Sequence, residues 1–261
     1  MSSRKDKLEA FGRILDIMDE LREKCPWDRE QTMESLRNLT IEETYELADA
    51  IIEKDMDEVR TELGDLLLHI VFYAKIGDEE GAFDIADVID TVNKKLVFRH
   101  PHVFGERKVA GSREVINNWE ELKMKENNGT KRVLSGVPSS LPALIKAHRI
   151  QDKVRAVGFD WANPDDVWQK VDEEIAEVRR EIKAGNQRKI EDEFGDLLFS
   201  VVNAARLFDI EPETALERTN KKFMSRFSHI EENARSHGRS IKDLSLEEME
   251  VLWVEAKEID R

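Results

Sequence analysis

The stretches "EDEFGDLLFS" (residues 191–200) and "RTELGDLLLH" (residues 60–69) decide the fold of this chain. Each places two acidic residues three positions apart around a glycine and then continues into an apolar run. The apolar residues in and around them recur at intervals of three and four, as on one face of a helix, and no alternating strand pattern of useful length is present. Both stretches therefore predict helices that carry paired carboxylates beside a core.

The acidic pattern belongs to a long internal repeat. Four acids reappear 131 residues later, so that Glu43, Glu46, Glu62 and Asp65 correspond to Glu174, Glu177, Glu193 and Asp196. "NKKLVFRHPH" (93–102) parallels "NKKFMSRFSH" (220–229), and "NWEELK" parallels "LWVEAK". So many matches in the same order would not arise by chance, so the repeat predicts a duplicated domain.

The expected fold class is all-α, with two tandem helical-bundle domains of four or five helices each. We predict domains at residues 1–126 and 142–261, joined by a linker at 127–141 that is rich in Gly, Ser, Asn and Pro. Short breaks at 54–56 and 184–186 predict that paired helices in each copy form antiparallel hairpins.

Composition narrows the class of protein. The net charge of -15 over 261 residues argues against stable binding of nucleic acid over a broad surface. A single cysteine excludes an intramolecular disulfide and fits a reducing compartment. The apolar runs are far shorter than the ~20 residues that cross a bilayer, and the start of the chain does not resemble a signal peptide. We therefore expect a cytoplasmic protein with no membrane association.

The repeated acids predict a metal site in each copy. Residues three apart lie on one helix face, so each helix of the hairpin presents a pair of carboxylates toward the other. Four converging carboxylates would repel one another unless a cation lay among them. Oxygen ligands favour Mg²⁺, Mn²⁺ or Ca²⁺ over zinc. Gly195, inside a helix, would permit close approach of a backbone or ligand.

Two other interpretations of the acids compete with a divalent-cation site. A single Glu-x-x-Glu pair is usually a solvated helix face, but two pairs on adjacent helices in both copies make that interpretation less favourable. A di-iron site would require Glu-x-x-His pairs. His69 follows Asp65 by four residues, yet its counterpart is Ser200, so iron is disfavoured.

Basic residues in each copy fit an anionic substrate. Lys222 and Arg226 lie four apart on one helix face, as do Lys95 and Arg99. Cations near a metal held by acids suit a polyphosphate chain, although exposed basic pairs are common. Trp253 and Trp119 could stack on a base or serve only in packing.

The motifs "EExxE", "ExxGDLL" and "NKKFxxRF" resemble those of the MazG family of nucleoside triphosphate pyrophosphohydrolases. The tandem arrangement, "CPWDREQT" (25–32), "RHPHVF" (99–104) and "VGFDW" (157–161) resemble its two-domain bacterial members, over nearly the whole chain. The resemblance implies the all-α pyrophosphohydrolase fold, a homodimer, and Mg²⁺-dependent hydrolysis of ribo- and deoxynucleoside triphosphates, including ATP, to monophosphate and pyrophosphate, with Mn²⁺ as a possible substitute. Such activity would serve nucleotide-pool control or house-cleaning.

The resemblance also implies roles for residues of the second copy. Glu174, Glu177, Glu193 and Asp196 would bind Mg²⁺ and act in catalysis through it, with the base unassigned. Lys222, Arg226 and Trp253 would contact the nucleotide, as would Lys189 and Lys170. As a hypothesis, water attacks the α-phosphorus, a free carboxylate orients the water, and Lys222 and Arg226 stabilise the leaving pyrophosphate.

The second copy is predicted to carry the main activity. Lys170 and Lys189 correspond to Leu39 and Glu58, so the first copy lacks these cations. Residues 1–130 hold 19 Lys/Arg against 30 Asp/Glu, and residues 131–261 hold 22 against 26. An anionic triphosphate should therefore approach the second site more easily. A non-catalytic nucleotide-binding regulator and an enzyme for a narrower substrate such as dUTP remain the alternatives.

Overall fold

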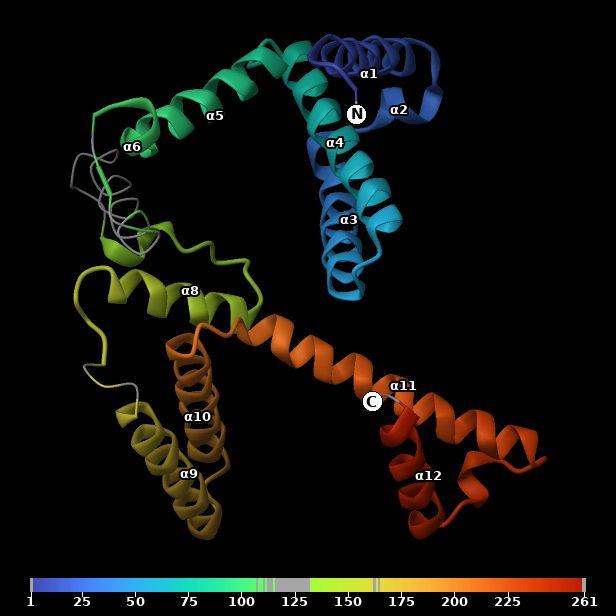
Figure 1. Ribbon diagram of the computed structural model, residues 1–261, viewed down its shortest axis with the longest axis vertical. Coiled ribbons are helices and arrows are strands. Elements are labelled where there is room, and N and C mark those ends of the chain that lie inside the picture. Colours follow the sequence, from blue (N-terminus) through green and yellow to red (C-terminus); the bar gives the residue numbers. More distant parts are fainter. Residues whose placement is uncertain are drawn as a thin grey trace. The chain divides into compact units, whose positions relative to one another are not determined.

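The computed structural model describes residues 2–106, 108–109, 111, 115, 132–161, 163 and 165–259. Within these residues the chain forms helices and no strand, which confirms the expected all-α class. The chain divides into two compact units, Met1–Trp119 and Glu120–Arg261, and each is described by itself (Figure 1). Because most of residues 107–131 lie outside the described set, the predicted linker limits stay a prediction.

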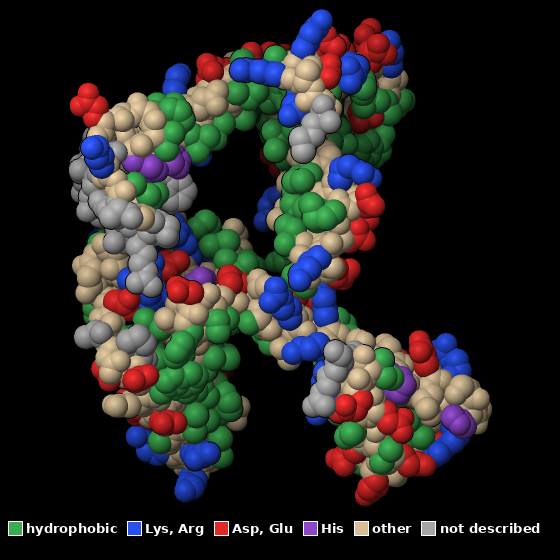
Figure 2. Space-filling view, in the orientation of Figure 1, with side chains coloured by type: hydrophobic (Ala, Val, Ile, Leu, Met, Phe, Trp, Pro, Cys, Tyr) green, Lys and Arg blue, Asp and Glu red, His purple; other side chains and the backbone are tan. Residues whose placement is uncertain are grey.

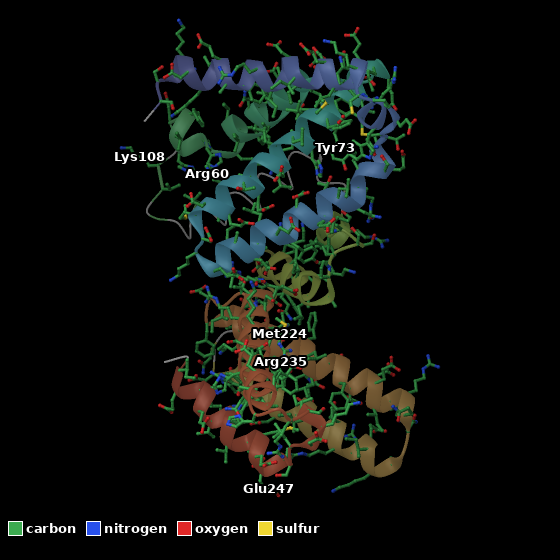
Figure 3. The ribbon with its side chains drawn as sticks, turned by 90° about the vertical axis from the view of Figure 1, so that its right-hand side faces the viewer. Arg60, Tyr73, Lys108, Met224, Arg235 and Glu247 are labelled. Atoms are coloured by element: carbon green, nitrogen blue, oxygen red, sulfur yellow. The ribbon has the colours of Figure 1, made fainter. Side chains whose placement is uncertain are left out.

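The first unit is built on three long helices. Its described elements are α1 (Arg4–Lys24), α2 (Pro26–Glu30), α3 (Met33–Glu53), α4 (Met56–Glu79), α5 (Ile85–Arg99) and α6 (Pro101–Phe104). Helices α1, α3 and α4 enclose a core whose fully buried members are Met18, Leu36, Val71, Phe72 and Ile76. Tyr73, labelled in Figure 3, hydrogen-bonds through its hydroxyl to Thr40 Oγ1 at 2.8 Å and so ties α4 to α3.

The turn between α3 and α4 confirms the predicted hairpin. Lys54 ends α3 in the left-handed region, with φ 60°, and its N–H donates to carbonyls of the last helical turn. Asp55 then caps α4, since its side chain accepts hydrogen bonds from the N–H groups of Asp57 and Glu58. Two residues thus reverse the chain and place the acids of α3 beside those of α4.

The second unit contains the matching hairpin. Its described elements are η1 (Val133–Gly136), α8 (Ala143–Arg155), α9 (Asp166–Ala184), α10 (Gln187–Leu207), α11 (Pro212–Ser236), η2 (Ile241–Asp243) and α12 (Leu246–Ile259). Gly185, with φ 72°, ends α9, and Asn186 caps α10 by accepting from the N–H of Lys189. The same two-residue solution therefore recurs, with glycine in place of Lys54 and asparagine in place of Asp55.

Helix α11 leads from the acidic hairpin to the C-terminal helix α12. The start of α11 packs near α8 and α10, and α12 folds back on the second half of α11 (Figure 1). Buried Val167, Val171 and Ala204 form a small core between α9 and α10. No described helix is long and apolar enough to cross a membrane.

Candidate metal and nucleotide site

Three carboxylates meet on the α9–α10 hairpin. Glu174 and Glu177 come from one face of α9 and Glu193 from the facing side of α10, and one oxygen of each lies within 4.8 Å of the others. This spacing allows all three to bind a single cation. The structure therefore brings together three of the four acids predicted for this copy, while Asp196 is exposed and lies outside this group.

Glu174 is the most enclosed acid of the second copy. Only 4% of the residue is exposed, and Lys170 Nζ lies 2.7 Å from its Oε1. Its Oε2 is buried and has no hydrogen-bond partner among the described residues. Hydrogen bonds to Glu174 and Glu173 raise the pKa of Lys170, so the lysine stays charged. Lys170 therefore lies at the acid group, and its contact with the nucleotide stays a prediction.

A second cation, Arg180, also lies against the acids. Its Nη2 is 3.1 Å from Glu177 Oε1 and its Nε is 3.3 Å from Glu181 Oε1. Burial and the charge of Glu177 raise the pKa of Glu193, while Arg180 opposes this effect. Sequence reasoning missed Arg180, although its position three residues after Glu177 on one helix could have indicated the pair.

The first copy gathers a related but different group. Glu43, Glu62 and Asp65 have oxygens within 4.8 Å of one another. Burial, followed by the charges of Glu46 and Glu58, raises the pKa of Glu62 to about 7. Glu62 is 5% exposed, and its Oε2 has no hydrogen-bond partner among the described residues.

Glu46 lies at the edge of the first-copy group. Burial and the charges of Glu43 and Glu42 raise the pKa of Glu46. Glu46 is thus close to Glu43 but outside the set that could share one ion. Convergence of all four acids of either copy on one ion stays a prediction.

Both groups fit a divalent cation by their chemistry. They contain only carboxylate oxygens, the ligands that Mg²⁺, Mn²⁺ and Ca²⁺ prefer. Each also has one buried oxygen, on Glu62 or Glu174, that the described chain leaves without a partner. A buried acceptor normally has a partner, so these two oxygens are suited to a cation.

Gly64 of α4 and Gly195 of α10 do not serve packing within their units. A Cβ added to Gly64 or Gly195 would meet no atom within 4 Å outside its own helix backbone and chain neighbours. Glycine inside a helix is less favourable than alanine by ~1 kcal/mol. That Gly195 admits a ligand or a second backbone stays a prediction.

The remaining predicted substrate contacts of the second copy lie on α11 and α12. Trp253 of α12 has its ring 5.0 Å from Phe223 and beneath the guanidinium of Arg226, 5.7 Å from the ring centre. Lys222 is exposed on α11. The main packing partner of α12 is α11, so within the second unit these residues are not placed beside the acids of the α9–α10 hairpin (Figure 1).

Other predicted contacts have separate positions. Lys189 is exposed in the first turn of α10, where its N–H bonds to the Asn186 cap. Lys95 and Arg99 lie on α5, the helix that follows α4 in the first unit. Trp119 lies outside the described residues. Their roles in binding stay predictions.

The fold and the two acid groups define an all-α protein with a duplicated carboxylate site suited to divalent cations. The sequence matches the MazG nucleotide pyrophosphohydrolase domain twice, over residues 31–104 and 163–231. These ranges contain all eight predicted acids, together with Lys222 and Arg226, and exclude Trp253.

Three curated relatives extend this match. The nucleoside triphosphate pyrophosphohydrolase/pyrophosphatase MazG of Thermotoga maritima is 44% identical over 250 residues, covering 95% of each chain. The nucleoside triphosphate pyrophosphohydrolase of Escherichia coli K12 is 44% identical over 262 residues, covering 97% of this chain and 100% of the relative. The Bacillus subtilis protein YabN is 48% identical over 255 residues, covering 96% of this chain and 52% of the relative.

The chain belongs to the MazG family of nucleotide pyrophosphohydrolases. It is therefore an enzyme of the nucleoside triphosphate pyrophosphohydrolase class, built from two copies of the MazG domain.

Proposed function

We propose that this protein hydrolyses ribo- and deoxynucleoside triphosphates, ATP among them, to nucleoside monophosphate and pyrophosphate in the presence of Mg²⁺. The observation that carries the proposal is the grouping of Glu174, Glu177 and Glu193 within 4.8 Å on the α9–α10 hairpin. The names of the similar proteins from Thermotoga maritima and Escherichia coli support the substrate class.

Glu174, Glu177 and Glu193 would hold Mg²⁺, with Asp196 completing the site from the next turn of α10. When bound, Mg²⁺ neutralises phosphate charge and polarises the phosphorus under attack. Mn²⁺ would substitute, because it accepts the same oxygen ligands.

The side chains around the acids fit hydrolysis at the α-phosphorus. An acid that is not fully engaged by the cation orients the attacking water and accepts its proton. Lys170 lies at the same site and would draw the triphosphate toward the acids. Lys189 would contribute from the start of α10.

The basic residues of α11 and Trp253 of α12 would contact the same nucleotide. They do not pack beside the acids of their own unit, so a substrate held by both sets would lie between two copies of the chain or require movement of α11. The first arrangement favours a homodimer.

Exposed apolar side chains support the dimer proposal. Phe194, Leu198 and Val201 on α10 are each 45–58% exposed. Figure 2 shows hydrophobic side chains gathered over this hairpin. Leu63 and Ile70 on α4 stand at the positions of Phe194 and Val201 in the repeat and are also about half exposed. Contiguous apolar surface of this kind is typical of interaction sites, and a second hairpin would cover it.

The proposal places the enzyme in the cytoplasm, in control of the nucleotide pool or in removal of aberrant nucleotides. The pools of its substrates lie there, and the single cysteine fits a reducing compartment.

Product analysis tests the proposal. Wild-type protein should convert a panel of ribo- and deoxynucleoside triphosphates to monophosphate and pyrophosphate with Mg²⁺, but not with EDTA. Glu193→Ala should fold and release at least 100-fold less pyrophosphate, since even outer-shell changes cost roughly 10–100-fold at metal sites. Binding of nucleotide without pyrophosphate release would favour a regulator, and release from dUTP alone would favour the narrow enzyme.

A further inference from the structure

A cavity in the second unit begins one helical turn beyond Asp196 on α10. It has a volume of about 440 Å³ and is lined by α8, the turn after it, and α10. This volume falls within the ~300–1,000 Å³ range of small-molecule sites. Its aromatic walls are Phe159 and Trp161 from the "VGFDW" stretch and Phe199 from α10. The "VGFDW" stretch has no role in the proposed metal site or in the proposed phosphate contacts.

Two amide side chains, Gln151 and Asn203, line the cavity together with the ion pair of Asp160 and Arg206. Gln151 is 4% exposed, donates through Nε2 to the carbonyl of Phe199 at 2.9 Å, and has a buried Oε1 without a partner among the described residues. Asn203 accepts through Oδ1 from Arg206 Nε and Nη2, at 3.0 and 2.8 Å. Arg206 thereby turns the Asn203 amide so that its N–H₂ group is available. The walls therefore offer one acceptor and one donor.

An ion pair fixes the aromatic rim of the cavity. Gly158 turns the chain after α8 with φ 87°, in the left-handed region. Asp160 then forms a salt bridge with Arg206, which is 5% exposed. Burial raises the pKa of Asp160, but the hydrogen bond from Arg206 lowers it, and the pKa ends below its usual value. The pair ties the turn that bears Phe159 and Trp161 to α10.

The residues of α10 that line the cavity lie on the same face of the helix as Asp196. Asp196, Phe199, Asn203 and Arg206 follow one another at intervals of three, four and three residues, so they form one stripe of the helix. At a rise of 1.5 Å per residue, Asn203 lies about 10 Å beyond Asp196 along the axis. A nucleotide with its phosphates at the acids would extend its base toward Asn203.

The first copy uses the equivalent positions for packing instead. Phe72 stands 131 residues before Asn203 and is 2% exposed, in the core with Met18 and Leu36. Leu68 stands in the place of Phe199 and packs against the same core. The hairpin fold thus does not require a polar cavity here, which points to a binding role in the second copy.

We propose that this cavity receives the nucleobase of the substrate, held between aromatic rings and read by Gln151 and Asn203. The inference rests on the proposed function and deepens it, since it places base recognition in the α8–α10 cavity rather than at Trp253. Every nucleobase has a flat apolar face and an edge with hydrogen-bonding groups, which match the cavity walls.

Steady-state kinetics with ATP, CTP, GTP and UTP test this placement. Asn203→Phe introduces the residue of the first copy into the cavity. It should raise KM about tenfold or more, as expected for a lost base contact, and reduce the differences between bases, with kcat changed less than twofold. Trp161→Ala should act in the same direction. Trp168→Ala removes a similarly exposed tryptophan that does not line the cavity and should leave KM unchanged.

A second readout separates this inference from the proposed function. Saturation-transfer NMR with adenosine and EDTA should show contact with wild-type protein and with Trp168→Ala, but not with Asn203→Phe of normal melting temperature. Adenosine contact without NTP hydrolysis would contradict the proposed function but would still support the cavity as a binding site for the base. Hydrolysis with base-dependent KM that responds to Trp253→Ala and not to Asn203→Phe would overturn the inference.

Discussion

The two acidic hairpins have the same backbone design and opposite electrostatic surroundings. In the second copy, Lys170 and Arg180 form salt bridges with the acids. In the first, the position of Lys170 is held by Leu39, which packs against the core, and Glu58 adds a further negative charge near Glu62. Duplication thus preserved the carboxylates while the neighbouring cations diverged, and we propose that this difference makes the second site the better one for a triphosphate.

A large effect is expected for Lys170→Leu, which gives the second copy the residue type of the first. The variant loses a cation at the phosphates and leaves Glu174, which is 4% exposed, without its lysine. We expect kcat/KM for NTP hydrolysis to fall about 10–100-fold. Lys183→Leu removes an equal charge from the same helix, at an exposed position, and should change kcat/KM less than twofold. Equal losses in both variants would mean that net charge, not the contact with Glu174, matters.

A smaller effect concerns the pH dependence of stability in EDTA. The pKa of Glu62 is about 7 in the folded chain, against an ordinary value of 4.5. The folded state therefore binds this proton more tightly than the unfolded state does. Stability from this group is fully present below about pH 4.5 and is lost as the pH rises through about 7.

Glu62→Gln should remove that loss. Urea denaturation at pH 5 and pH 8 should show a smaller pH difference for the variant than for wild type, with greater stability of the variant at pH 8. Glu193→Gln is the matched change in the second copy and should have less effect, since Arg180 partly offsets the neighbouring charges. An unchanged pH difference in Glu62→Gln would show that Glu62 titrates normally.

The smallest effect concerns the hairpin turns. Lys54 has a left-handed backbone, φ 60°, where the second copy has Gly185 at φ 72°. Lys54→Gly should raise the free energy of unfolding by about 1 kcal/mol, because a side chain is strained in this region. Gly185→Lys should lower it by a similar amount. Urea denaturation of the full chain measures both, and effects of the same sign would contradict the equivalence of the two turns.

Helical periodicity and the repeat were sufficient to predict the all-α fold and both hairpins. The turns at Lys54 and Gly185 were recognisable because each is followed by a residue whose side chain caps the next helix. The acids were also recognisable, since spacing of three residues places them on one face. These features depend on neighbours in sequence.

Features that depend on packing were not predictable. Three acids rather than four share each group, and the excluded member differs, Glu46 in one copy and Asp196 in the other. Spacing along a single helix does not specify which acids of the facing helix come within reach. The separation of Trp253 from the acids follows from the course of α11, which a repeat alone does not specify. The cavity near Gln151 arises from three segments and has no local sequence signature.

The central claim is that the second acid group is the working site and the first is weak or structural. The most direct measurement compares pyrophosphate release from ATP by Glu193→Ala and Glu62→Ala, both verified as folded, at saturating Mg²⁺. We predict that Glu193→Ala loses nearly all activity while Glu62→Ala keeps at least half. Equal losses in the two variants would contradict the account.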